Sequence, residues 1–170
     1  MARKKVDTFE HIDETNQLLR EGGLLLVSQG KDEKTNIMTI GWGFLGTIWR
    51  KPYFVIAVRQ SRYTYKLLEE SNSFTVCLPA KGMDKVLEVC GEQSGRDMDK
   101  CNSLKLTVEK GLTIDTPFIG ECPTHYECEI KYKNVLTPEA LDKEIVQEVY
   151  PKRDMHVLYY GEVKGAYTLI

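Results

Sequence analysis

The sequence predicts a mainly β fold with short helices, in which antiparallel strands form a barrel or a sandwich. Runs rich in β-branched and aromatic residues recur along the chain. Turns separate most of these runs, whereas parallel strands would need crossover helices. The 170 residues suffice for one domain with a sizeable core. We therefore expect a single domain over residues 1–170, with residues 1–14 as a peripheral N-terminal segment.

Residues 1–70 contain two predicted helices and three predicted strands. Residues 15–21 are expected to form a short helix that Gly22-Gly23 ends. A helix over 61–70 is expected to begin with Ser61 as its N-cap. The strands are expected in the apolar run 23–29, in the stretch 35–49 rich in Thr, Ile and Trp, and in the run 53–59.

Residues 71–170 contain one more predicted helix and five more predicted strands. Residues 81–90 place apolar side chains at helical spacing, and Gly91 is expected to stop that helix. A polar loop follows over 91–100. The strands are expected at 73–78, 104–110, 126–136, 144–150 and 156–167.

Residues 41–46 read GWGFLG and match the G-x-G-x-x-G pattern of dinucleotide-binding turns. Such a site needs its glycines in a turn that opens a helix. Here Pro52 follows too soon, because it would end a helix before two turns were complete. The glycines are expected instead to mark a bent strand, at a bulge or where a ligand approaches the backbone closely.

Composition and charge exclude several classes of function. The net charge of −2 creates no basic field for nucleic acid or for an anionic membrane. Apolar runs of about eight residues are too short to span a bilayer. The charged N-terminus lacks the apolar core of a signal peptide, so we expect a cytoplasmic protein.

The chain has five cysteines, an odd number that favours reduced thiols over disulfides. Cys122, His125 and Cys128 in the segment CPTHYEC are the nearest approach to a metal motif. On a strand, however, His125 would face away from the two thiols, and a fourth ligand is missing. We expect no metal site.

The segment VRQSRYTY at 58–65 is a candidate anion site, because helix starts offer free N–H groups and the positive end of a dipole. It supplies two guanidinium groups and three hydroxyl groups, from Arg59, Ser61, Arg62, Tyr63 and Thr64. The loop CGEQSGRDMDK at 90–100 adds donors that suit a phosphate. The residues of 58–65 fit an anion site and an ordinary capped helix with solvated arginines equally well, whereas the loop 90–100 taken alone better fits a polar surface loop.

Acid–base groups are sparse. His11 lies in the charged N-terminal segment, whereas His125 and His156 lie on predicted strands. The chain contains no Ser-His-Asp arrangement and no HExxH motif. A phosphate cradle with few acid–base groups favours a cofactor that supplies its own chemistry.

Four ordered blocks are NIMTIGWG at 36–43, the long stretch KPYFVIAVRQSRYTYKLLEESNSFTVCLP at 51–79, SGRDMDK at 94–100 and HVLYYGEVKGAY at 156–167. Together they resemble the flavin reductase-like family, and most closely its flavoredoxin branch. The resemblance covers residues 22–167 and implies a split β-barrel with Greek-key-like antiparallel strands. It also implies a homodimer with FMN near the subunit interface.

The resemblance also implies the residues that bind FMN. Asn36, Met38 and Thr39 would lie against the isoalloxazine ring, with backbone N–H groups hydrogen-bonded to the N5 and O4 region. The phosphate would be held by Arg59, Ser61, Arg62, Tyr63 and Thr64, with assistance from Lys100.

His156 is the candidate catalytic residue, because in flavin reductases the matching His lies near the face used by the nicotinamide donor. Many relatives carry Asp-His, then four residues, then Gly. Here His156 and Gly161 keep this spacing, but Met155 stands at the Asp position. The difference favours a flavoprotein that receives its electrons otherwise than directly from NADH or NADPH.

The implied function is that of an FMN-dependent oxidoreductase of the flavin reductase type. It would take a hydride from NADH or NADPH and pass electrons to a small molecule or a redox protein. Two alternatives stay open: a non-enzymatic electron carrier with tightly held FMN, and a split-barrel binding module for another cofactor such as haem.

Overall fold

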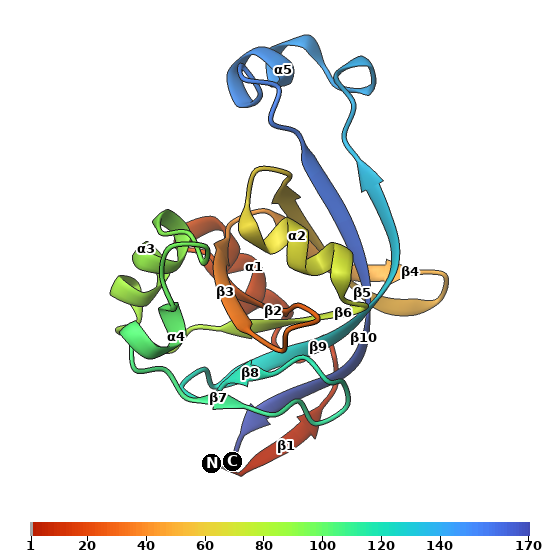
Figure 1. The fold of residues 1–170 in the computed structure, drawn as a ribbon. Coiled ribbons are helices and arrows are strands. Elements are labelled where there is room, and N and C mark those ends of the chain that lie inside the picture. The colour runs from red at the N-terminus through yellow and green to blue at the C-terminus, as the bar shows by residue number, and fades with distance from the viewer. Residues whose placement is uncertain (1) are drawn as a thin grey trace.

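The computed structural model describes residues 2–170, and its main element is an eight-stranded antiparallel sheet. Along the sheet the strand order is β3-β2-β6-β9-β10-β5-β4, and β1 pairs with β10 beside this path (Figure 1). The strands of this sheet are β1 (Arg3–Val6), β2 (Leu24–Gln29), β3 (Thr35–Ile40), β4 (Gly43–Ile48), β5 (Lys51–Arg59), β6 (Ser73–Leu78), β9 (Thr124–Val135) and β10 (His156–Leu169). The predicted fold class is thus confirmed.

The remaining elements lie around this sheet. They are α1 (Ile12–Glu21), α2 (Tyr63–Glu70), α3 (Asp84–Glu92), α4 (Lys100–Ser103), α5 (Lys143–Val149), a 3-10 turn η1 (Pro138–Ala140), and a small sheet of β7 (Val108–Glu109) with β8 (Phe118–Ile119). Helices α3 and α4 lie beside β3, and the long β9–β10 pair carries η1 and α5 at its far end (Figure 1). No helix in residues 2–170 is long and apolar enough to cross a bilayer.

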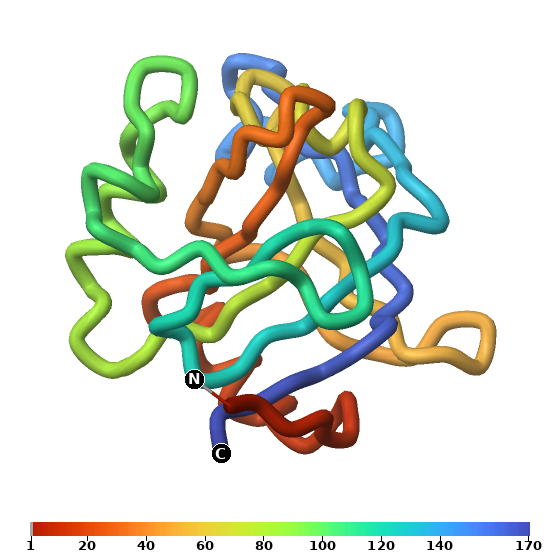
Figure 2. The backbone as a smooth tube through the Cα atoms, turned by 60° about the horizontal axis from the view of Figure 1, so that its bottom comes forward, coloured from red at the N-terminus to blue at the C-terminus, as the bar shows by residue number. Residues whose placement is uncertain are grey.

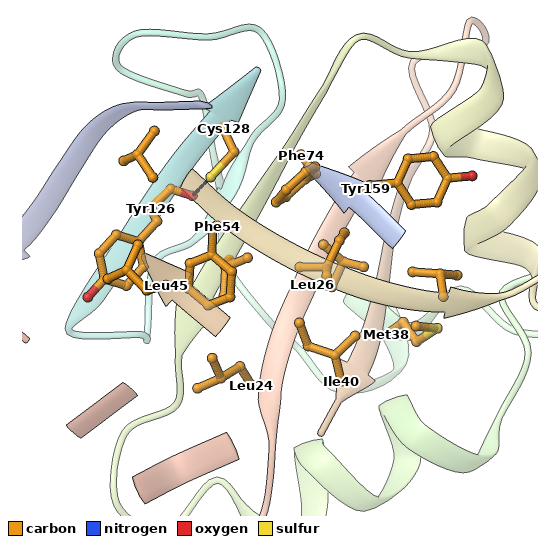
Figure 3. Close-up of a cluster of buried hydrophobic side chains, with 14 of the residues drawn as sticks. Leu24, Leu26, Met38, Ile40, Leu45, Phe54, Phe74, Tyr126, Cys128 and Tyr159 are labelled. Carbon is orange, nitrogen blue, oxygen red and sulfur yellow. Dashed lines mark hydrogen bonds between the residues drawn. The ribbon is translucent and has the colours of Figure 1, made fainter. Parts of the chain in front are cut away.

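Strand β2 shows why its sequence is continuously apolar, because both of its faces are buried. Leu24 and Leu26 belong to the main core (Figure 3), which also contains Phe54 of β5. Leu25 and Val27 point the other way, into a second cluster. That cluster is completed by Cys90, Cys101 and Phe118, from α3, α4 and β8. The predicted strand at 23–29 is confirmed.

The stretch 35–49 forms two strands, whereas the sequence predicted one. The chain turns a corner at Gly41-Trp42, since β3 pairs with β2 and β4 pairs with β5. Both pairings run in continuous register, so the predicted bend is confirmed and neither pairing contains a bulge. The alternative, a close approach of a ligand to the backbone, stays a prediction. Gly43 begins β4 where a Cβ atom would stand 2.5 Å from the Val55 carbonyl oxygen. No helix follows these glycines directly, which agrees with the rejection of a dinucleotide turn.

The helix boundaries differ from the prediction in two places. Helix α2 begins at Tyr63 with Arg62 at its N-cap, so the assignment of Ser61 as the cap is wrong. The Ser61 hydroxyl donates instead to a distant carboxylate, described below. Helix α3 continues through Gly91 to Glu92, so Gly91 does not stop it.

Residues 144–150 were predicted to be a strand and form helix α5. Asp142 caps the helix, because its side chain accepts from the Glu144 backbone N–H. The neighbouring strand β10 is paired on one side with β9 and on the other with β5 and β1. It therefore offers no free edge to another strand. The predicted strand 104–110 shrinks to β7 because Leu104 and Leu106 pack against the second core cluster.

The N-terminal segment joins the sheet through β1, which pairs with the end of β10, so both chain ends lie together (Figure 2). The Arg3 guanidinium donates to the carbonyls of Gly120, Cys122 and Pro123. It also lies 4.5 Å from the centre of the Phe118 ring. Arg3 therefore ties β1 to the segment before β9.

Candidate functional site

The structure contains a cavity of about 310 Å³ where β3, the end of β5, the start of α2 and the segment between α3 and α4 meet. We call it the main cavity. It is lined by eight residues of the predicted cofactor site: Asn36, Met38, Arg59, Ser61, Arg62, Tyr63, Thr64 and Lys100. Residues up to 64 positions apart in the sequence thus converge on one place.

A smaller cavity of about 160 Å³, which we call the side cavity, adjoins it. Met38, Arg59 and Arg62 line both cavities. The remaining two predicted residues, Thr39 and His156, line only the side cavity. The structure therefore separates the candidate catalytic residue from most of the candidate phosphate-binding residues.

Asn36 connects β3 to the start of α2. Its side-chain amide is 5% exposed and donates to the Thr64 hydroxyl over 2.9 Å. Gly95 packs directly against this pair, since a Cβ atom there would lie 2.0 Å from the Asn36 Oδ1 atom and 2.9 Å from the Tyr63 ring. The absence of a side chain at Gly95 lets the loop close over β3.

Lys100 places a buried cation at the main cavity. The side chain is 4% exposed, and its ammonium donates to the carbonyls of Gln93 at 3.1 Å and Cys90 at 3.4 Å. No carboxylate pairs with it among the described residues. Burial lowers the pKa of Lys100, and nearby Arg62 lowers it further. A buried cation without a counter-charge suits an anionic ligand.

Arg62 and Arg96 add positive charge to the same cavity. Arg62 donates from one Nη atom to the Gly91 carbonyl over 2.9 Å and so joins the start of α2 to the end of α3. Arg96 donates to the Ser61 carbonyl and lies 5.4 Å from the centre of the Tyr63 ring. These contacts hold both guanidinium groups at the cavity wall.

Arg59 lines the main cavity and also makes contacts that the sequence did not predict. Its guanidinium donates to the carbonyls of Asp154 at 2.8 Å and Val149 at 3.2 Å. It also lies 5.2 Å from the centre of the Tyr150 ring. Arg59 therefore fastens the segment before β10, and much of its donor capacity is already used.

Asp154 is a site residue that the sequence analysis missed. Its carboxylate accepts from the Ser61 backbone N–H at 3.2 Å and from the Ser61 hydroxyl at 2.6 Å. The two residues meet because β10 pairs with β5 in a register that sets His156 opposite Arg59. Asp154 lines the main cavity and shows that Ser61 presents two donors to an oxyanion. No local signal reveals this contact, which spans 93 positions.

His156 forms one wall of the side cavity. Its Nδ1 atom is 2.8 Å from the Tyr150 hydroxyl oxygen, and its ring centre is 4.7 Å from that of Trp42. Burial, and secondarily the charge of Arg59, lowers the pKa of His156 to about 4. The imidazole is therefore neutral at pH 7 and cannot act as a cationic acid there.

The depressed pKa of His156 predicts a loss of stability in acid. Because the unfolded chain takes up the proton near pH 6.5 and the folded protein only near pH 4, the contribution of His156 to the free energy of unfolding should fall between these values and then level off. The loss should be on the order of 3 kcal/mol. Urea unfolding between pH 6.5 and pH 4 measures this free energy. In His156→Gln it should fall less with pH than in wild type, because the titrating imidazole is gone. Identical pH dependence of the two proteins would contradict the prediction.

The five cysteines are all buried and free. A hydrogen bond with Cys77 raises the pKa of the Cys122 thiol, and burial raises it further. His125 lies 3.1 Å from the Glu127 carboxylate and stacks on Phe118, and burial lowers the pKa of its imidazole, so it is part of a buried hydrogen-bonded cluster. Within residues 2–170, no three His, Cys, Asp or Glu side chains are grouped to hold a metal ion.

Comparison with known proteins places this geometry in context. A family model described as a flavin reductase like domain matches residues 20–169. The structure of a flavoredoxin from Methanosarcina acetivorans is 28% identical, has a TM-score of 0.69, and the match covers 87% of this chain and 68% of that one. A flavoredoxin of Desulfovibrio vulgaris shares the fold at 22% identity and a TM-score of 0.69, with 86% and 69% covered.

Curated relatives also match. An uncharacterised protein of Archaeoglobus fulgidus is 31% identical over 98 residues, which are 58% of this chain and 55% of that protein. The chain spans between 55% and 62% of the length of the curated relatives it matches.

Proposed function

The chain belongs to the flavin reductase-like family, and from this premise we propose that it binds FMN in the main cavity and works as an oxidoreductase. The observation that carries the proposal is the buried ammonium of Lys100, which lies at the main cavity together with Arg62 and Arg96. A phosphate monoester would supply the negative charge that these three side chains lack.

The phosphate end of FMN would contact Arg62, Lys100 and the two donors of Ser61. The Thr64 hydroxyl accepts a hydrogen bond from Asn36, so it would position β3 against α2 more than it would contact the ligand. Tyr63 is covered by Arg96 and would contribute its backbone N–H at the start of α2. Arg59 would act mainly through the segment that it fastens.

The isoalloxazine ring would lie against β3, at Asn36, Met38 and Thr39. Strand β3 stands at one end of the sheet path and pairs only with β2 among the described strands. The N–H groups on its other edge have no strand partner, so they are available to the N5 and O4 region. This replaces the predicted bulge as the source of donors.

Bound FMN would supply hydride and single-electron transfer, which no side chain of this protein provides. The protein would contribute fixed charges and backbone dipoles, because N–H groups of β3 beside the ring stabilise negative charge there. His156 would hold its neutral imidazole at the edge of the ring, where NADH or NADPH is expected to approach. We propose His156 as the catalytic residue on that side.

One observation favours the non-enzymatic carrier. Met155 is buried and puts no carboxylate beside His156, where the family resemblance leads one to expect aspartate. Asp154, one position earlier, is committed to Ser61. Asp154 raises the pKa of the imidazole less than burial and Arg59 lower it, so His156 is not a cationic proton donor at neutral pH.

We further propose a homodimer. Phe44 and Trp49 are exposed in the β4 hairpin, and Tyr132 and Val135 are exposed on β9 where it leaves the body of the sheet. Burial of such side chains against a second copy would be favourable. Sedimentation should show that wild type is a dimer and that the dimer of Trp49→Ser dissociates more readily. The cytoplasmic location stays a prediction.

A spectrum of the purified protein tests the proposal. We expect flavin absorbance as isolated or after FMN is added and excess is removed by gel filtration. A haem spectrum, or a protein that stays colourless with FMN, would contradict it. Anaerobic NADH or NADPH should then bleach the flavin promptly in an oxidoreductase, whereas slow bleaching with fast reduction by a redox protein would identify the carrier.

Removal of the Asp154 charge is expected to tighten FMN binding. In Asp154→Asn the competing carboxylate on Ser61 is gone, so the phosphate meets less repulsion. Partly exposed charge interactions contribute about 0.2–1 kcal/mol, so the Kd for FMN should fall by a factor of about 1.4 to 5. Titration calorimetry measures this. Asp97→Asn, an equal charge change on an exposed residue, is the control. Weaker binding in Asp154→Asn would mean that this carboxylate supports the site.

A further inference from the structure

A groove of about 680 Å³ lies between α1, the segment 79–82 and the start of α3, and it is larger than the main cavity and the side cavity. We call it the α1–α3 groove. Leu18 and Leu87 line it with half-buried side chains, and Pro79 and Ala80 add further apolar surface. The groove is therefore long enough in apolar contact to seat a side chain of a partner protein.

The lining of the α1–α3 groove is acidic. It contains the exposed carboxylates of Glu14, Glu21 and Asp84, whereas Lys81 is its one basic residue. Within the described residues Glu21 and Asp84 form no ion pair, and Glu14 pairs only with His11, at 3.2 Å. The protein itself therefore leaves these carboxylates largely uncompensated, and such a surface attracts a partner that presents cations.

Helix α3 connects the α1–α3 groove to the proposed cofactor site. Asp84 and Leu87 line the groove, and Cys90 of the same helix lines the main cavity. Thr39, on the strand proposed to lie against the isoalloxazine ring, donates its hydroxyl hydrogen to the Leu87 carbonyl over 2.6 Å. A partner in the groove would therefore be separated from β3 by a single helix, which measures about 10–12 Å across with its side chains.

We propose that the α1–α3 groove docks a basic segment of a redox partner protein, with cationic side chains at its three carboxylates and an apolar side chain against Leu18 and Leu87. The inference deepens the proposed function and rests on it for the bound flavin. The fully reduced flavin would lose two electrons, one to each of two one-electron acceptors, and its two protons would go to water. A basic partner would be guided to the groove and away from the main cavity, whose lining carries Arg62, Arg96 and Lys100.

Ferric cytochrome c, a basic haem protein that accepts one electron, is a suitable probe. The protein is loaded with FMN, reduced anaerobically by light, and mixed with the probe in a stopped-flow instrument. At low ionic strength the triple variant Glu14→Gln, Glu21→Gln, Asp84→Asn should reduce cytochrome c about tenfold more slowly than wild type, because electrostatic guidance is lost. The difference should shrink as salt screens the carboxylates of the wild type.

A second triple variant, Glu33→Gln, Glu139→Gln, Glu148→Gln, is the matched control. It changes the net charge equally at three exposed residues that do not line the groove. Its rate with cytochrome c should stay within about twofold of wild type, because distant surface charges are screened. Both triple variants should bind FMN as wild type does and should reduce ferricyanide, a small anionic acceptor, no more slowly.

The outcomes separate this inference from the proposed function. Equal rates of the two triple variants with cytochrome c overturn the inference even if FMN binds normally. Calorimetry with the FMN-free protein should show that the groove variant binds cytochrome c about fivefold more weakly than the control variant. That result in a protein unable to bind FMN would support the docking surface and overturn the proposed function. Altered dimer dissociation of the groove variant, with unchanged cytochrome c kinetics, would assign the groove to a second copy and overturn the inference.

Discussion

Replacement of Arg62 by Gln together with Lys100 by Met is expected to weaken FMN binding at least a hundredfold and riboflavin binding less than threefold. Both side chains line the main cavity, and Lys100 is buried there without a counter-charge. Hydrogen bonds to charged groups contribute about 1.5–3 kcal/mol each, and 1.4 kcal/mol corresponds to tenfold. Riboflavin lacks the phosphate and should therefore be nearly insensitive.

Quenching of flavin fluorescence on binding measures both affinities. A double variant with the same charge change at Arg20 and Lys85, which are exposed on α1 and α3, should bind both flavins as wild type does. An equal loss of FMN and riboflavin affinity would show that the two cations do not contact the phosphate. Unchanged binding of both flavins would place the cofactor elsewhere.

Substitution of Gly95 by Val is expected to weaken the binding of FMN and riboflavin alike, by about tenfold to a hundredfold. The new Cβ atom would lie 2.0 Å from the Asn36 Oδ1 atom, and the buried Asn36 is held by Thr64. The loop must therefore move away from β3. Overpacking of this kind costs about 1–3 kcal/mol, which sets the expected range.

Gly46→Val is the matched control, because a Cβ atom there meets nothing closer than the Phe44 ring at 3.7 Å. Circular dichroism and thermal unfolding should show that both variants retain the fold. If Gly95→Val binds FMN more weakly but binds riboflavin normally, the loop contacts only the phosphate end of the ligand.

The local pattern of apolar residues predicted most of the strands, because positions that are buried in the fold are apolar in the sequence. Strand β2 is apolar at successive positions, since its two faces pack into two core clusters. The same pattern failed over 144–150, where Ile and Val suggest a strand but the segment forms a helix that Asp142 caps and that leaves β10 paired with β9 and β5. Whether an edge is free depends on the whole sheet, which no short stretch reveals.

The candidate site was likewise predicted only in part from the sequence. The segment 59–64 was predicted as a unit because its cations and hydroxyls are neighbours in sequence. The contacts of its members with distant parts of the chain were not predicted. Arg59 fastens the segment before β10, and Ser61 binds Asp154 and does not cap α2. Both contacts arise from the pairing of β10 with β5.

The amino-acid sequence by itself determined the fold class, the family and the residue types that can hold a phosphate, because these depend on patterning and on short segments. Only the tertiary structure decided which charges are buried, which donors are already used, and that a second cavity adjoins the first. The physical reason is that desolvation and hydrogen-bond geometry depend on which distant strands are in register. Lys100 and Asp154 acquire their properties from neighbours that the chain brings to them only when it folds.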